Sequence, residues 1–254
     1  MRRAAVPGPL VERLARDLID RGPGDRLAEE LLEWLAASAR FRAFAEAHRD
    51  KIRKKLRTAA DAEALRDVRA ELLVARLLLA DPRVELAFEA YGSGKGGPDF
   101  TVTYRGTESF NLEVTRLRRV PRGTATTYGS PLLAKLRQLP PSVANAVLVA
   151  VEGDTAEILD VAAATRALRS RADAKDEAFF ARRGFEGTHG FYERYLRLSA
   201  VVVWCDGAGD ARASLWTNRS ARIALPERAA RACLRCLRTA PPGPGGLPKG
   251  DRGP

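Results

Sequence analysis

The chain has 254 residues, 45% of them hydrophobic and 30% charged, which is the composition of a globular protein with a sizeable core. It has no run of about 18 uncharged apolar residues and no apolar stretch near its N-terminus, so a membrane span and a secretory signal are excluded. Its 43 Lys and Arg against 32 Asp and Glu give a net charge of +11, which favours a nucleic-acid partner. Three cysteines form no disulfide framework, so the cytoplasm is the expected location.

Hydrophobic periodicity divides the chain into helices and strands. The expected helices cover about residues 9–57 in several pieces, 61–80, 131–139, 160–180 and 226–237, and the expected strands cover 84–88, 100–104, 110–114, 146–151, 198–204 and 214–217. Asp25 is expected to cap a helix, and Gly187 to His189 are expected to lie in a loop. This alternation predicts an α/β fold with a mixed central sheet flanked by helices.

Three segments are expected along the chain. Residues 1–58 form an N-terminal helical segment and residues 59–238 form the α/β domain. Residues 239–254 are rich in Gly and Pro, cannot bury much apolar surface and are expected to be disordered.

Two carboxylates are predicted to face each other across a hairpin. A three-residue turn centred on Gly106 pairs residues whose numbers sum to 212, which places Asp99 opposite Glu113 with Cβ atoms about 4.5–5.5 Å apart. Like charges in this position repel each other, and a divalent cation between them relieves the repulsion. The alternative is that both residues line a solvated face of the sheet, with Pro98-Asp99 forming a turn.

A third carboxylate, Glu71, falls in the apolar stripe of the expected 61–80 helix, with Val68, Val74 and Leu78 as neighbours on the helical wheel. A carboxylate among apolar side chains requires a charged partner or a metal ion. The alternatives are an ion pair with an arginine, or an edge position from which the side chain reaches water.

The element order, with Glu71, Pro98-Asp99 and then Glu113-Val114-Thr115 after thirteen intervening residues, resembles the PD-(D/E)xK (restriction-endonuclease-like) nuclease superfamily over residues 61–152. The resemblance implies an α-β-β-β-α-β core in which Asp99 and Glu113 bind Mg²⁺ or Mn²⁺ and Glu71 is the third acid. It also implies that Lys135 and Gln138 contact the substrate.

One position departs from the family pattern, because Thr115 stands where the family has its lysine. A threonine hydroxyl carries no charge, so another cation must activate water and offset the phosphate charge. Lys135 is the preferred substitute and Lys95 the second choice. Arg116 and Arg118 have the wrong strand parity for this role and are expected, with Lys95, Thr115 and Gln138, to bind the substrate.

These residues predict a Mg²⁺- or Mn²⁺-dependent nuclease that hydrolyses phosphodiester bonds of DNA. The first alternative is a catalytically inactive nuclease-fold module that binds nucleic acid or a protein partner, as Thr115 suggests. The second is an unrelated basic α/β domain in which the three acids are coincidental.

Overall fold

The computed structural model describes residues 8–19, 25–91, 97–117, 129–151, 160–205 and 212–239. Lys95, Arg118 and residues 240–254, on which expectations were placed, lie outside the described residues. The helices are α1 (Pro9–Leu18), α2 (Arg26–Ala37), α3 (Ala39–Ala47), α4 (Arg49–Thr58), α5 (Ala62–Leu78), α6 (Gly129–Leu136), α7 (Val161–Asp173), α8 (Glu177–Ala181), α9 (Gly187–Tyr195) and α10 (Glu227–Arg238). The strands are β1 (Val84–Phe88), β2 (Phe100–Tyr104), β3 (Glu108–Leu117), β4 (Asn145–Val151), β5 (Leu198–Cys205) and β6 (Arg212–Thr217).

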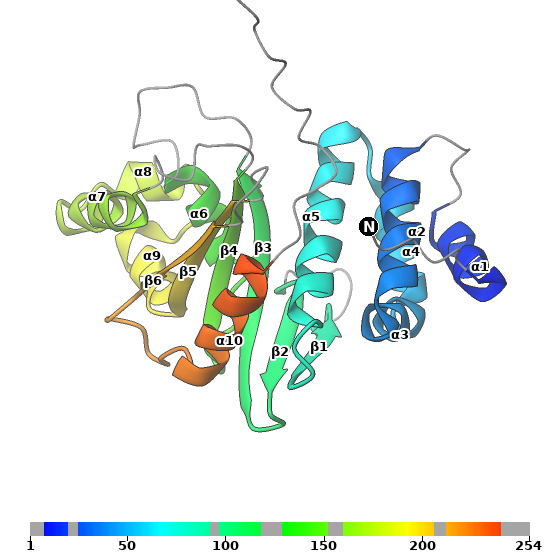
Figure 1. Ribbon diagram of the computed structural model, residues 1–254. Coiled ribbons are helices and arrows are strands. Elements are labelled where there is room, and N and C mark those ends of the chain that lie inside the picture. The colour runs from blue at the N-terminus through cyan, green and yellow to red at the C-terminus, as the bar shows by residue number, and fades with distance from the viewer. Residues whose placement is uncertain are drawn as a thin grey trace, which may run out of the picture.

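The strands form one sheet in the order β1-β2-β3-β4-β5-β6. Strands β3, β4 and β5 run parallel to one another, whereas the β1-β2, β2-β3 and β5-β6 pairs are antiparallel. The predicted α/β class with a mixed sheet flanked by helices is therefore confirmed (Figure 1). No helix in the described ranges has the length and apolar character needed to cross a membrane.

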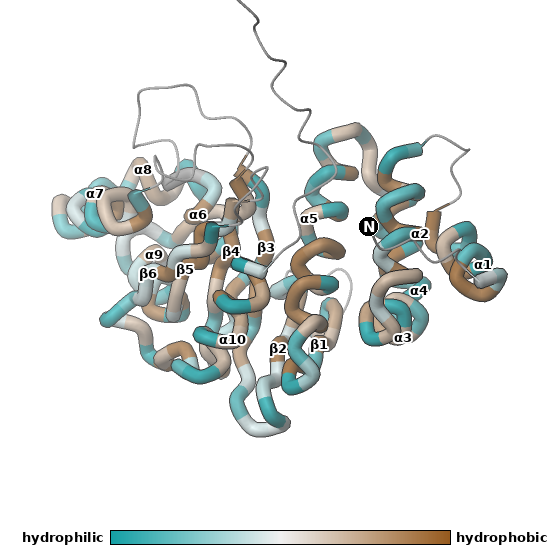
Figure 2. The backbone as a smooth tube through the Cα atoms, in the orientation of Figure 1, coloured by the Kyte–Doolittle hydropathy of each residue, from teal (hydrophilic) through white to brown (hydrophobic). Residues whose placement is uncertain are grey.

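The two faces of the sheet carry different helices (Figure 1). Alternate residues of β4 enter two apolar clusters, because successive side chains of a strand point to opposite faces. Ala146, Leu148 and Ala150 belong to the cluster that includes α5, α10 and the N-terminal helices. Val147 and Val149 belong to the cluster of α6, α7 and α9. Burial on both faces explains why the central strands read as continuous apolar runs, brown along β4 in Figure 2.

The hairpin register is as predicted. Phe100 pairs with Leu112 and Thr101 with Asn111, so paired numbers sum to 212. The turn places Arg105 and Gly106 in the left-handed region, with φ of 53° and 70°. A glycine at the second of these positions adopts this conformation without the strain of a Cβ atom.

The N-terminal helices are fixed to the end of the sheet that carries β1. From α3, the Arg40 guanidinium donates to the carbonyls of Leu79, Asp81 and Val84 at 2.8, 2.6 and 2.5 Å. From α4, the Lys51 ammonium donates to the carbonyls of Phe88 and Glu89, the last residue of β1 and the next one, at 2.8 and 3.0 Å. These contacts bring α4 alongside the hairpin.

The expected single helix over residues 160–180 is wrong. It divides into α7 and α8 because Lys175 adopts a φ of 55°, after which the Asp176 carboxylate caps α8 by accepting from the Phe179 amide at 3.1 Å. The expected loop at Gly187 to His189 is also wrong, since these residues form the first turn of α9. Glu177 holds that turn by accepting from the amide and the hydroxyl of Thr188 at 2.8 and 2.7 Å.

Candidate functional site

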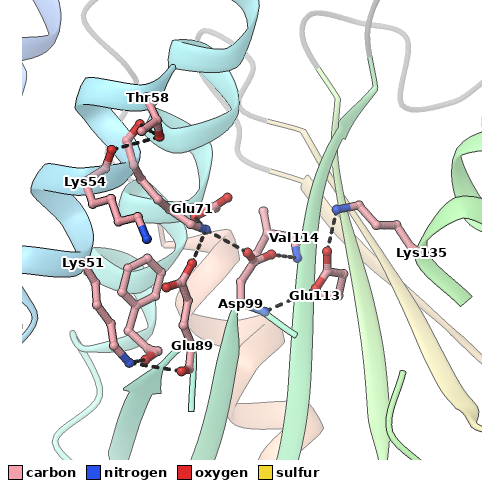
Figure 3. A network of polar contacts seen from close by, with 11 residues as sticks. Lys51, Lys54, Thr58, Glu71, Glu89, Asp99, Glu113, Val114 and Lys135 are labelled. Carbon is pink, nitrogen blue, oxygen red and sulfur yellow. Dashed lines mark hydrogen bonds and ion pairs between the residues drawn. The ribbon is translucent and has the colours of Figure 1, made fainter. Parts of the chain in front are cut away.

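The two hairpin carboxylates meet at the end of β2. Asp99 immediately precedes β2, and the register that pairs Phe100 with Leu112 places it opposite Glu113. The Asp99 amide donates to Glu113 Oε2 at 3.2 Å, and Asp99 Oδ2 accepts from the Val114 amide at 2.8 Å (Figure 3). Both side chains are buried, so the backbone holds two carboxylates next to each other and largely out of contact with solvent.

A lysine joins the third acid to this pair. Lys55 of α4 extends its ammonium between α5 and the hairpin, where Nζ lies 2.6 Å from Glu71 Oε2 and 3.2 Å from Asp99 Oδ1. A further carboxylate, Glu89 Oε1, lies 3.2 Å from the same nitrogen, and the Phe88 ring centroid lies 5.0 Å from it. Glu71 and Asp99, far apart in sequence, therefore converge on one cation.

A second lysine approaches from the other face of the sheet. Lys135 lies in the last turn of α6, and its Nζ lies 2.5 Å from Glu113 Oε1 (Figure 3). The helix α6 packs on the sheet face opposite to α5. Glu113 thus accepts from the Asp99 amide with one oxygen and from Lys135 with the other.

The site carries more negative than positive charge. The carboxylates of Glu71, Glu89, Asp99 and Glu113 lie with the ammonium groups of Lys55 and Lys135, so full ionisation leaves two negative charges. Burial and the neighbouring Asp99 raise the pKa of Glu71 to about 8 and that of Glu113 to about 7. Burial opposes the charge of both lysines, but the attraction of the carboxylates outweighs it, so the pKa of each lies above the usual value.

The raised pKa values predict that the metal-free protein loses stability as the pH increases. An unfolded glutamate has a pKa near 4.5, so between pH 4.5 and 8 the folded chain keeps protons on Glu71 and Glu113 that the unfolded chain has released. The contribution of these two groups to the free energy of unfolding is complete below pH 4.5 and is lost as the pH rises through 7 and 8. Urea unfolding in EDTA across this range measures it.

The matched comparison for this pH dependence is Glu71→Gln, which cannot ionise at this position. The free energy of unfolding of the variant should fall less steeply with pH than that of the wild type. Identical slopes for the two proteins would show that Glu71 keeps an ordinary pKa.

Three of the other residues predicted to bind substrate, Thr115, Arg116 and Gln138, belong to the described part of the chain. Arg116 of β3 points to α5, where its guanidinium pairs with Glu63 and lies 3.1 Å from Asp67. It therefore lies on the sheet face opposite to Lys135, as its strand parity predicts. Thr115 shares the strand parity of Glu113 and is partly buried. Gln138 lies in the turn that follows α6 and not on the helix, and its backbone N–H donates to the Lys135 carbonyl at 3.0 Å.

Lys55 and Glu89 were not predicted as site residues. Lys55 belongs to the basic run Lys51 to Arg57, which looks like a solvated surface in the sequence. One signal was present, because Lys51 and Lys55 are four residues apart and adjoin the buried positions Ile52 and Leu56 on the helix. Cations beside an apolar stripe require acidic or carbonyl partners on the neighbouring element.

Comparison of the chain with family models, with curated proteins and with solved structures finds no match.

The donor set was tested for its fit to a metal ion. In the arrangement observed, no group of three or more His, Cys, Asp or Glu side chains among the described residues is placed to hold a metal ion. The Lys55 ammonium instead lies between the oxygens of three carboxylates. The chemistry of the site nevertheless fits a divalent cation, because Glu71, Glu89 and Asp99 already surround the Lys55 ammonium with carboxylate oxygens, and Glu113 lies beside Asp99. A metal ion at this point requires Lys55 to withdraw.

Proposed function

We propose that the protein is a nuclease that uses Mg²⁺ or Mn²⁺ to hydrolyse phosphodiester bonds of DNA. The observation that carries this proposal is that Asp99 lies beside both of the other acids: it shares the Lys55 ammonium with Glu71, and its amide donates to Glu113. Buried carboxylates repel one another, and a fold that brings several together without function would lose stability.

The order of the elements supports the proposal. The succession α5-β1-β2-β3-α6-β4 is the α-β-β-β-α-β order implied by the resemblance to PD-(D/E)xK nucleases. Asp99 and Glu113 lie at the hairpin and Glu71 on the preceding helix, where that resemblance expects the three acids. A restriction-endonuclease-like core is therefore part of the proposal.

Asp99, Glu113 and Glu71 are the residues that would hold the ion. When bound, Mg²⁺ or Mn²⁺ supplies an activated water molecule and stabilises charge on the phosphate. Lys135 keeps its contact with Glu113 and places a positive charge beside the reacting phosphate, which compensates for the uncharged Thr115. Lys55 is a second candidate for this role, because its ammonium already contacts Asp99 and Glu71.

Cleavage of a supercoiled plasmid and of labelled duplex DNA tests the proposal. The purified protein is expected to cut in Mn²⁺ and in Mg²⁺ and to be inactive in EDTA, with metal binding followed separately by calorimetry. The absence of both cleavage and metal binding under these conditions would overturn the proposal.

A second candidate is a nuclease-fold module that binds nucleic acid without cutting it. The favouring observation is that Lys55 already neutralises part of the acidic site without any metal ion. In this case DNA binding falls steeply with salt and Mg²⁺ does not lead to product.

A further inference from the structure

The helix α4 is the most basic element that the structure describes. Residues 49–58 hold six Lys and Arg and a single acid, Asp50. Ile52 and Leu56 are buried and fix the helix to the core. The cations, with Asp50 and Thr58, therefore occupy the rest of the helix surface.

These cations form a continuous strip around the helix. At 3.6 residues per turn, the order around the axis is Lys55, Lys51, Lys54, Arg57 and Arg53, with steps of roughly 40–60°. Lys55 begins the strip at the carboxylates, and Lys51 reaches the end of β1. Arg53, Lys54 and Arg57 are exposed, so the strip leads from the acidic site to solvent (Figure 3 shows Lys51, Lys54 and Thr58 on this helix).

The three outer cations differ in their surroundings from the basic residues that the fold holds in place. Arg40 is bound to three carbonyls, Arg116 is paired with two acids, and many surface arginines pair with a neighbour in sequence. Within the described part of the chain, the side chains of Arg53, Lys54 and Arg57 make no hydrogen bond or ion pair. An open pocket of about 520 Å³ lies against them, lined by Asp50, Arg53, Lys54, Arg57 and Thr58.

We propose that this surface of α4, formed by Arg53, Lys54 and Arg57, binds the phosphate backbone of nucleic acid beside the acidic site. The helix has no aromatic side chain on which bases would stack and no Asn or Gln to pair with adenine, so its exposed groups are cations, for which the phosphate backbone is the matching ligand. Binding through phosphates alone is independent of sequence and accepts a duplex. The inference takes its partner from the proposed function but does not depend on cleavage.

The position of this α4 surface beside the acidic site affects how a phosphate can approach that site. An acidic cluster repels the phosphates that a nuclease must approach, and adjacent cations offset this repulsion.

The test is binding of a fluorescent random-sequence DNA duplex in EDTA, measured by anisotropy over about 50–200 mM salt. The triple variant Arg53→Gln, Lys54→Gln, Arg57→Gln is expected to bind roughly 100-fold more weakly. The slope of log Kd against log salt should decrease by about 3, because each lost phosphate contact contributes roughly 0.9. A second duplex of unrelated sequence should give the same values.

The matched control removes the same charge elsewhere. Arg166, Arg169 and Arg182 are exposed on or beside α7 and α8, and their replacement by Gln should change Kd less than about threefold. Equal losses in both triple variants, or wild-type binding by the α4 variant, would overturn the inference. The two proposals can fail separately. If the wild type binds the duplex but does not cleave it, only the nuclease proposal is refuted.

Discussion

Glutamine in place of Glu113 is expected to lower metal-dependent DNA cleavage on the order of 1,000-fold or more. The substitution preserves the size of the side chain and removes one of the carboxylate charges that would hold the ion, while leaving a group able to contact the Asp99 amide. An amide also binds Mg²⁺ less well than a carboxylate. Initial rates on a labelled duplex in Mn²⁺, at equal protein concentration, measure the effect.

Two controls accompany this prediction. Glu85→Gln removes an exposed carboxylate from β1, away from the acidic site, and should cut at the wild-type rate. Thermal unfolding of Glu113→Gln shows whether it is folded, because Lys135 loses its carboxylate partner in this variant. Unchanged cleavage by folded Glu113→Gln would assign the activity to another site or to a contaminant.

The local part of the candidate site follows from the sequence. Asp99 meets Glu113 because a three-residue turn fixes the register of an antiparallel hairpin, and register determines which side chains oppose each other. Glu71 could be singled out because a carboxylate in an apolar helical stripe is costly. These arguments use residues within one helix or one hairpin, where spacing determines geometry.

The remainder of the site depends on tertiary contacts that spacing does not report. Lys55 reaches Glu71 and Asp99 because Arg40, Lys51 and the aromatic residues of α3 fix the N-terminal helices to the end of the sheet. The local signal, a position beside the buried Ile52 and Leu56, does not say which residues Lys55 meets on the neighbouring elements. The division of α7 from α8 was missed for a similar reason, because Lys175 adopts a left-handed conformation that its residue type does not favour.

Lys55→Met is expected to destabilise the metal-free protein and to increase its response to Mg²⁺. Methionine keeps most of the aliphatic length but leaves Glu71, Glu89 and Asp99 without their shared cation. Loss of one partner from a largely buried ion pair costs about 2–4 kcal/mol of unfolding free energy. Urea unfolding in EDTA measures this loss.

The same measurement in Mg²⁺, at matched ionic strength, separates a metal site from a structural ion cluster. If the carboxylates bind the ion, Mg²⁺ replaces the missing ammonium and stabilises Lys55→Met more than the wild type, in which Lys55 competes for the same oxygens. Lys51→Met is the matched control, because Lys51 lies one turn earlier on α4 and donates to carbonyls, so its loss should give no additional response to Mg²⁺. If Mg²⁺ does not stabilise a folded Lys55→Met variant, the carboxylates form a structural ion cluster with Lys55 and do not bind a metal ion. The proposal of a metal-dependent nuclease would then be wrong.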